Sequence, residues 1–368
     1  MAQFEIFKKL PLGGVDRRSL VTTLSERGAS TAKALLDKQR AAIRSAGAKV
    51  ADDMAVVFLG GSNGITRALA AQLVFGEKAN VFGVHYDSAK MQIGVHHTEA
   101  MTTAAKAEGL TAEFFNRDAT RDKTIDEVVD ILKSRYRAVH FINGIAAGAT
   151  KRYEKHGPTT VRDIDVAFDP VLQVPDFSKA ENIRKMGLVE VGVATEAEIE
   201  RTNKFMGTSS KLWTDALGRA GLLARDESIV AFCDYDYEPD DPVYAMGPLA
   251  GAKVLQRETM GEIKAEHGVH TVKLCYPAMC TTALGAIPGG TLMYAGTAQV
   301  LLSRGSYRDI PQLAFDSMAM FNEPPSDGTL RLDGHYQSIL SEFHILKDGL
   351  SPDDVPGCFD QLLAHHAS

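Results

Sequence analysis

A tyrosine and a lysine past the middle of the 368-residue chain are of the types that handle a proton. Eight residues separate Tyr244 from Lys253, and an apolar pattern at helical spacing runs through Lys253. An ammonium near a phenol favours the phenolate and strengthens the phenol as a hydrogen-bond donor to a developing oxyanion. Because a tyrosine and a lysine on one helix are common, the pair gains meaning only from the fold that positions it.

A glycine-rich turn over residues 60–66 is the second candidate site. An apolar, β-branched run precedes the turn and an apolar helical pattern follows it. Glycines there let the backbone approach a pyrophosphate, and the helix N-terminus offers free N–H groups. Thr66 replaces the third glycine of the common fingerprint, and a simple tight connection is the alternative interpretation. We predict cofactor contacts from Gly60, Gly61, Ser62, Asn63, Gly64 and Ile65.

Asp87 follows the next apolar run, 23 residues beyond Gly64. A carboxylate at that place accepts hydrogen bonds from the hydroxyls of the adenosine ribose and repels a 2′-phosphate, which predicts NADH in preference to NADPH. Tyr86, directly before it, is included among the predicted cofactor contacts. A solvated turn aspartate is the alternative interpretation of Asp87.

Two further strand ends carry candidate cofactor residues. Asp118 and Ala119 follow the third apolar run, where they could cap the adenine edge. Asn143 and Gly144 follow the fourth, where the cofactor's ribose and nicotinamide would pass and a small residue would let the backbone come close. Either pair could instead be ordinary residues of a turn.

The candidate sites share one position, at the ends of segments expected to be strands. Those segments alternate with helical patterns, which predicts right-handed βαβ crossovers and a parallel sheet covered on both faces. We therefore predict an α/β fold with a Rossmann-like, doubly wound parallel sheet, in which ligands bind at the carboxyl ends of the strands. The expected strands lie near residues 55–61, 80–86, 111–115, 138–144, 227–234 and 271–277.

The pattern also divides the chain into parts. Prolines and β-type runs break the alternation between about residues 150 and 194, which predicts a hairpin insertion. The three predicted parts are a helical N-terminal extension over 1–50, a dinucleotide-binding domain over 51–345 that contains the insertion, and a C-terminal tail over 346–368.

Two helices outside the regular alternation can be bounded. Helical spacing extends over about residues 18–47 and is interrupted at Gly28. Thr195 and Glu198 form a T-x-x-E capping box, which predicts a helix from there to about residue 217.

Composition excludes several classes of function. The net charge of −7, without a long basic run, gives no source for attraction to nucleic acid. No stretch has the roughly 18 uninterrupted apolar residues of a membrane span, and the first residues lack the apolar segment of a signal peptide. We therefore expect a cytoplasmic protein, monomeric or homodimeric, with no nucleic-acid or membrane partner.

The cysteines and histidines do not predict a metal site. The four cysteines lack paired C-x-x-C spacing, so they are interpreted as reduced core thiols. The adjacent pairs His96–His97 and His365–His366 point in different directions on a helix or strand, which disfavours chelation by either pair. Ser209 and Ser210 lack the spacing of a nucleophile elbow.

With these residues in view, the sequence resembles the single-chain NADH-dependent trans-2-enoyl thioester reductases of bacterial fatty-acid metabolism, which are related to the short-chain dehydrogenases. That family keeps a Tyr-x8-Lys pair, which is longer than the spacing of ordinary short-chain dehydrogenases. The resemblance extends over about residues 54–345. It rests on Tyr244 and Lys253, on 194–207 (ATEAEIERTNKFMG) and 212–217 (LWTDAL), and on Thr281 with 286–288 (AIP).

The resemblance implies hydride transfer from NADH to C3 of a 2,3-unsaturated thioester carried on CoA or on an acyl carrier protein. Tyr244 would bond the thioester oxygen as enolate charge develops, Lys253 would anchor the ribose, and C2 would be protonated afterwards. Thr281 would contact the cofactor. Met206 and Trp213 would belong to the substrate-facing segment, although a packed helix face explains them equally well.

The sequence departs from the family pattern at several places. The family often has a second tyrosine ten residues before the first, whereas this chain has Asp234 there and Tyr235 one place along. We therefore take Tyr235 as the second candidate catalytic tyrosine. The loop after Asp87 is shorter, the N-terminal section differs and the C-terminal tail is truncated. Two alternatives stay open: a carbonyl reductase or alcohol dehydrogenase using the same pair, and a non-catalytic NADH sensor.

Overall fold

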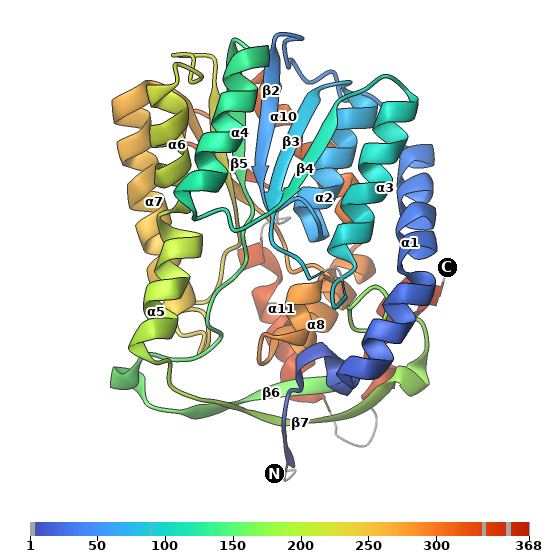
Figure 1. Cartoon of the computed structure of the whole chain (residues 1–368). Coiled ribbons are helices and arrows are strands. Elements are labelled where there is room, and N and C mark those ends of the chain that lie inside the picture. The colour runs from blue at the N-terminus through green and yellow to red at the C-terminus, as the bar shows by residue number, and fades with distance from the viewer. Residues whose placement is uncertain (1–3, 89, 333–335, 351–354, 368) are drawn as a thin grey trace.

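The computed structural model describes residues 4–88, 90–332, 336–350 and 355–367. Its centre is a parallel sheet of seven strands (Figure 1), with the spatial order β10-β9-β8-β5-β2-β3-β4. This order is doubly wound, because the chain moves outward from β2 in one direction and then crosses to build the other half. The strands are β2 (Met54–Leu59), β3 (Asn80–His85), β4 (Ala112–Asn116), β5 (Ala138–Asn143), β8 (Ile229–Asp234), β9 (His270–Cys275) and β10 (Thr329–Arg331).

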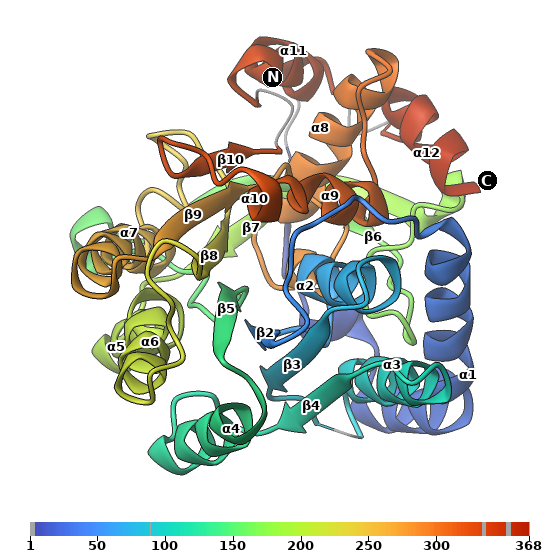
Figure 2. The same ribbon diagram turned by 90° about the horizontal axis from the view of Figure 1, so that it is seen from above.

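Helices cover both faces of the sheet, as the alternation predicts (Figure 2). One face carries α2 (Gly64–Ala71), α3 (Gly94–Ala107) and α9 (Ile310–Ser317). The other carries α4 (Asp122–Arg135), α6 (Ser209–Arg219) and α7 (Pro248–His267). Alternate residues of β2 serve the two cores: Val56 and Phe58 face the first, Ala55, Val57 and Leu59 the second.

The N-terminal helix α1 (Arg17–Ala42) is continuous through Gly28, so the predicted interruption there is wrong. A Cβ at Gly28 would lie only 2.5 Å from Cδ2 of His96 on α3, so glycine allows the two helices to approach closely. The helix also ends five residues before the predicted limit at 47, and Asp16 caps its start by accepting the N–H groups of Arg18 and Ser19.

The predicted hairpin insertion is confirmed. β6 (Thr159–Val166) and β7 (Ile183–Val191) pair antiparallel, and they lie beyond the carboxyl ends of the main sheet (Figure 1). A short strand that the sequence did not predict, β1 (Ile6–Phe7), adds to β7 in parallel. The N-terminal section is therefore part strand and not wholly helical.

Lys9 ties this three-stranded sheet to the C-terminal half of the chain. Its Nζ lies 2.7 Å from Asp163 Oδ2, 2.7 Å from the Ile287 carbonyl oxygen and 2.8 Å from Thr291 Oγ1. Asp163 is fully buried and also accepts the backbone N–H groups of Gly289 and Leu292. Burial lowers the pKa of Lys9 below its ordinary value, although Asp163 favours the charged ammonium.

The remaining helices follow the two sheets. The capping box of Thr195 and Glu198 is confirmed at the start of α5 (Glu196–Thr202), and a π-helical turn over Asn203–Gly207 separates α5 from α6. The C-terminal section is mainly helical, with α8 (Gly290–Ser303), α10 (Ala319–Asn322), α11 (Tyr336–Gly349) and α12 (Asp360–Ala367). No helix within the described residues is long and apolar enough to cross a membrane.

Candidate active site

Parallel strands bring the candidate residues to one edge of the main sheet. The glycine-rich turn follows β2, Asp87 follows β3 and Gly144 follows β5. Tyr244 lies in the loop between β8 and α7, and Lys253 lies in the second turn of α7. The carboxyl edge therefore collects both the predicted cofactor residues and the predicted proton-handling pair.

A short turn before α7 fixes Tyr244. The carboxylate of Asp241 accepts the backbone N–H groups of Val243 at 2.9 Å and Tyr244 at 2.6 Å. Burial raises the pKa of Asp241, while these two hydrogen bonds act in the opposite direction. At Gly247, a Cβ would lie 2.1 Å from the Lys151 carbonyl oxygen, so the chain leaves this turn through a space that only glycine fits.

Three tyrosines gather at the turn. The ring centroids of Tyr235 and Tyr244 are 4.5 Å apart in an edge-to-face arrangement, and the ring of Tyr237 stacks on Tyr244 at 5.7 Å. Burial raises the pKa of Tyr244 above its usual value of 10, and a hydrogen bond with the Tyr235 hydroxyl acts against this rise. The expectation that a nearby ammonium favours the Tyr244 phenolate is therefore not met, because burial dominates and keeps the phenol protonated.

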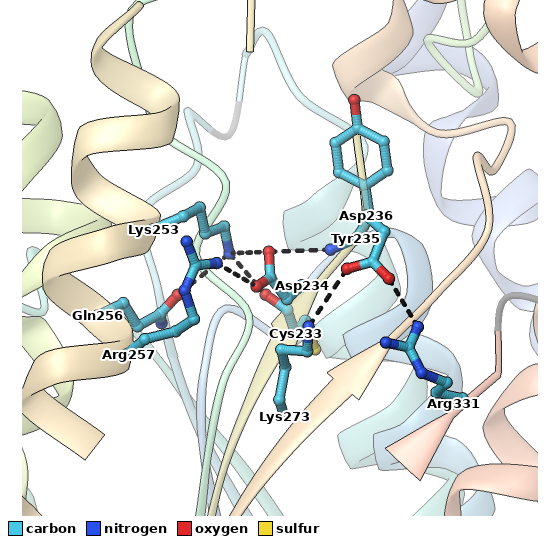
Figure 3. Close-up of polar contacts among 9 residues, drawn as sticks. All are labelled: Cys233, Asp234, Tyr235, Asp236, Lys253, Gln256, Arg257, Lys273 and Arg331. Carbon is cyan, nitrogen blue, oxygen red and sulfur yellow. Dashed lines mark hydrogen bonds and ion pairs between the residues drawn. The ribbon is translucent and has the colours of Figure 1, made fainter. Parts of the chain in front are cut away.

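Lys253 points to the end of β8 (Figure 3). Its Nζ donates to the Cys233 carbonyl oxygen at 2.7 Å and to Gln256 Oε1 at 3.1 Å, and it lies 3.5 Å from Asp234 Oδ1. The lysine is 9% exposed, so its charge is largely removed from water and depends on these acceptors.

The turn after β2 has the backbone that a phosphate-binding loop requires. Gly60, Gly61 and Gly64 have φ values of 94°, 98° and 57°, in the region that favours glycine. Thr66 Oγ1 accepts the N–H of Gly61 and donates to the Asn63 carbonyl oxygen, so the threonine that replaces the third glycine stabilises the turn. Ile65 and Ser62 are buried in the same turn.

Asp87 faces the glycine-rich turn. Its side chain is 8% exposed, and Oδ2 lies 2.8 Å from Nδ1 of His85. A Cβ at Gly94, the first residue of α3, would lie 2.4 Å from Asp87 Oδ2 and 2.6 Å from Asn63 Nδ2. The alternative of a solvated turn aspartate is therefore excluded. Tyr86 is 78% exposed and lies on the surface beside it.

Asp118 and Ala119 already have protein partners. Burial opposes ionisation of Asp118, but hydrogen bonds from Thr120 and the nearby Arg121 outweigh burial and lower its pKa. The Ala119 carbonyl oxygen accepts Nε1 of Trp213 at 2.8 Å. Trp213 is 0% exposed and stacks on Phe141, so its side chain lies in the core and not in a substrate-facing segment.

Asn143 and Gly144, the two predicted cofactor residues at the end of β5, have different surroundings. The Asn143 amide donates to the hydroxyls of Ser209 at 2.8 Å and Ser210 at 2.9 Å, so this buried side chain joins β5 to α6. A Cβ at Gly144 would lie 2.1 Å from Thr66 Cγ2, so glycine lets the chain pass directly beside the glycine-rich turn. From the sequence, Ser209 and Ser210 were considered only as possible nucleophiles. No sequence pattern indicates that they bind Asn143.

The resemblance-based residues Thr281 and Met206 lie beside the site. Thr281 Cγ2 is 3.4 Å from the position that a Cβ at Gly64 would take, which places it against the glycine-rich turn. Met206 is buried in an apolar cluster against which Tyr244 packs. Met293 of α8, which no sequence pattern indicated, has its Sδ 4.0 Å from the Tyr235 hydroxyl.

The described residues contain one group with the spacing of metal ligands, Asp215, Glu266 and His267. The Lys211 ammonium forms ion pairs with both of its carboxylates and supplies the positive charge there. The four cysteines are free thiols, and burial raises the pKa values of Cys233 and Cys280 to about 12.

Comparison with known sequences places residues 90–313 in the family described as the trans-2-enoyl-CoA reductase catalytic region. An enoyl-[acyl-carrier-protein] reductase [NADH] of Pseudomonas putida is 28% identical over 309 residues, which cover 79% of this chain and 76% of that protein. A protein of the same description from Serratia proteamaculans is 28% identical over 280 residues, covering 73% and 69%.

Solved structures of low sequence identity confirm the predicted fold. The Clostridium acetobutulicum trans-2-enoyl-CoA reductase in complex with NADH has a TM-score of 0.73 at 20% identity, over 98% of this chain and 91% of that one. The Treponema denticola trans-2-enoyl-CoA reductase in complex with NAD has a TM-score of 0.68 at 19% identity, over 100% and 92%.

Proposed function

The chain belongs to the trans-2-enoyl-CoA reductase family, and on that premise we propose that it reduces the 2,3 double bond of an acyl thioester with NADH. The observation that carries this proposal is the position of Tyr244, a buried phenol in the loop between β8 and α7, at the same carboxyl edge of the sheet as the glycine-rich turn and Lys253. The NADH-dependent relatives and the NADH-bound structural neighbour support NAD(H) as the cofactor.

The residues at the sheet edge fit a dinucleotide. The positive φ values of the turn and the close passage at Gly144 leave backbone, and not side chains, facing the place where a pyrophosphate would lie. We infer that the turn holds the phosphates, that Asp87 bonds the adenosine ribose, and that Thr281 contacts the cofactor near Gly64. Tyr86, Asp118 and Ala119 would border the adenine. NADH supplies the hydride that is delivered to C3 of the substrate.

Tyr244 would donate a hydrogen bond to the thioester oxygen while negative charge develops there. Burial suits this role, because the low local dielectric strengthens a hydrogen bond from the phenol to an enolate. Tyr235 would support this role, since its hydroxyl is hydrogen-bonded to that of Tyr244 and helps to fix the phenol. A proton from solvent, added at C2 as the enolate collapses, would complete the reaction.

Lys253 would bind the hydroxyls of the nicotinamide ribose, and Met206 would contact the acyl chain next to Tyr244. The substrate is an acyl thioester, and we propose both CoA and acyl carrier protein as carriers to be tested. A monomer or homodimer in the cytoplasm is the state that we propose for the active protein. Light scattering after size-exclusion chromatography would measure the assembly.

Turnover of NADH with crotonyl-CoA and crotonyl acyl carrier protein tests the function. Tyr244→Phe should lower kcat about 100- to 1,000-fold, as loss of one oxyanion donor does, while the Kd of NADH stays near that of the wild type. Product mass and the position of deuterium from deuterated NADH distinguish reduction of C=C from reduction of C=O. Normal turnover by Tyr244→Phe would contradict the assignment, and NADH binding without turnover of enoyl thioesters or ketones would favour the sensor.

A further inference from the structure

Asp234, the last residue of β8, contacts two cations that both reach it from α7 (Figure 3). Its Oδ1 is 3.5 Å from Nζ of Lys253, and its Oδ2 is 3.4 Å from a guanidinium nitrogen of Arg257. The carboxylate is 1% exposed and also accepts the backbone N–H of Tyr235 at 2.9 Å. One buried negative charge is thus shared by two positive charges.

The two cations differ in their freedom. Lys253 and Arg257 are four residues apart on α7, so they lie on the same face of the helix. Lys253 is nearly enclosed, whereas the Arg257 side chain is 42% exposed and reaches Asp234 from the solvent side. Because a buried carboxylate requires compensation, removal of one cation leaves the other to neutralise it alone.

The bonds of Lys253 show where Asp234 acts. An ammonium has three donors, and two of them have short acceptors in the Cys233 carbonyl oxygen and Gln256. The third meets Asp234 at 3.5 Å, which is beyond an ordinary hydrogen bond, so the attraction there is mainly Coulombic. A hydroxyl can therefore compete for this donor more easily than for the other two.

We propose that Asp234 is a positioning residue whose carboxylate, shared between Lys253 and Arg257, sets how firmly the Lys253 ammonium is held and thus how strongly it binds the ribose of NADH. The inference rests on the proposed function, in which Lys253 is the ribose anchor. Arg257 neutralises part of the negative charge of Asp234. Asp234 therefore holds the Lys253 ammonium less firmly, and Lys253 can bind the cofactor.

Asp236 provides a matched control on the same segment. Its carboxylate points away from Lys253, towards β9 and β10 (Figure 3). There it pairs with Lys273 at 3.2 Å and with Arg331 at 2.6 Å. Asp236→Asn removes the same charge two residues away without touching the surroundings of Lys253. We expect it to change stability and to leave the Kd of NADH within about twofold of the wild type.

A double-mutant cycle tests the proposal through the Kd of NADH, from fluorescence titration, together with kcat and KM. Arg257→Met should raise the Kd and the KM of NADH about tenfold, equivalent to about 1.4 kcal/mol, with little change in kcat. Arg257→Lys, which keeps the cation, should restore the wild-type Kd. In the Asp234→Asn background the effect of Arg257→Met should disappear, and Asp234→Asn alone should not weaken NADH binding.

An Arg257→Met effect of the same size in both backgrounds, or none in the wild type, would overturn the proposal. If Asp234→Asn does not fold, the comparison of Arg257→Met with Arg257→Lys still tests whether the half-exposed cation controls NADH affinity. Failure of the wild type to turn over enoyl thioesters would reject the proposed function instead. If the wild type does reduce enoyl thioesters but the effects of Asp234→Asn and Arg257→Met on the Kd of NADH are additive, only the role of Asp234 is rejected.

Discussion

The rings of Tyr235 and Tyr244 meet edge to face, with centroids 4.5 Å apart and planes inclined by 73°. The hydroxyl of Tyr235 is hydrogen-bonded to that of Tyr244 and lowers its pKa, against the larger effect of burial. Tyr235 is one place from the position where the resembled family often has its second tyrosine. The arrangement shows how a tyrosine shifted by one residue still reaches the first one.

Tyr235→Phe should lower kcat about tenfold, because loss of a hydrogen bond worth about 1 to 1.5 kcal/mol leaves the Tyr244 hydroxyl less firmly oriented towards the thioester oxygen. Tyr237→Phe is the control, since the Tyr237 ring stacks on Tyr244 and phenylalanine preserves that contact. Steady-state rates of both variants with crotonyl-CoA would check this. Equal rates for the two variants would remove the special role of Tyr235.

Asp241→Ala should reduce kcat about tenfold or more, because the N–H groups of Val243 and Tyr244 lose their shared acceptor and the phenol moves. Asp241→Asn keeps an acceptor oxygen and should retain most of the activity. If alanine and asparagine at this position behaved alike, the turn would not depend on the acceptor.

Asp87→Ser should change the choice of cofactor. The carboxylate lies beside Asn63 and the start of α3, where a 2′-phosphate would meet its negative charge. We expect kcat/KM with NADH to fall about 10- to 100-fold, as for loss of hydrogen bonds to a charged group, and kcat/KM with NADPH to rise. An unchanged ratio of the two values would place the adenosine ribose elsewhere.

Alanine at Gly247, directly before α7, and alanine at Gly261, within α7, should have opposite effects. A Cβ at Gly247 would lie 2.1 Å from one backbone carbonyl oxygen and 2.6 Å from another, so Gly247→Ala should cost about 1 to 3 kcal/mol of stability and displace Tyr244. Gly261 lies within the helix with no heavy atom near its added Cβ, so Gly261→Ala should stabilise by about 0.5 to 1 kcal/mol. Urea unfolding of both variants measures the difference.

Stability should fall in mild acid because of buried histidines. Burial lowers the pKa of His97 to about 3 and that of His140 to about 4, from 6.5. As the pH falls below about 6.5, the unfolded chain binds protons at these rings before the folded protein does, so the free energy of unfolding decreases.

His140→Asn isolates one of these contributions. His140 Nδ1 accepts the N–H of Ile229, and the asparagine oxygen can take over that bond. Urea unfolding at pH 7.5, 6 and 5 should show a smaller loss of stability for the variant than for the wild type. Parallel pH dependences would mean that this ring does not stay neutral in the fold.

The parts of the fold that sequence predicted are those with a repeated local signal. Apolar strands alternating with helical patterns predicted the parallel sheet, and a change to β-type runs predicted the hairpin insertion. β1 and β10 were missed because two and three residues carry no periodicity. Gly28 was interpreted as a helix interruption, since its packing against His96 is visible only once α1 and α3 are placed together.

The candidate site divides in the same way. Residues defined by strand ends, such as Gly60 and Asp87, lie where expected, because topology alone places them. Asn143 and Trp213 were harder to interpret, since the direction of a side chain depends on partners far along the chain, Ser209 in one case and Ala119 in the other. The pairing of Asp234 with both Lys253 and Arg257 likewise depends on how β8 packs against α7, so no local sequence pattern indicates it.

The anchoring of Lys9 bears on how the protein matures. Its acceptors come from residues up to 282 positions further along, and one of them, Thr291, stands two residues before the Met293 that touches Tyr235. A ribosome makes this lysine 282 residues before Thr291, so we expect the ammonium to stay hydrated on the nascent chain until that later segment has been synthesised. Catalytic competence would then appear only after the segment around Thr291 has been made and has met the lysine.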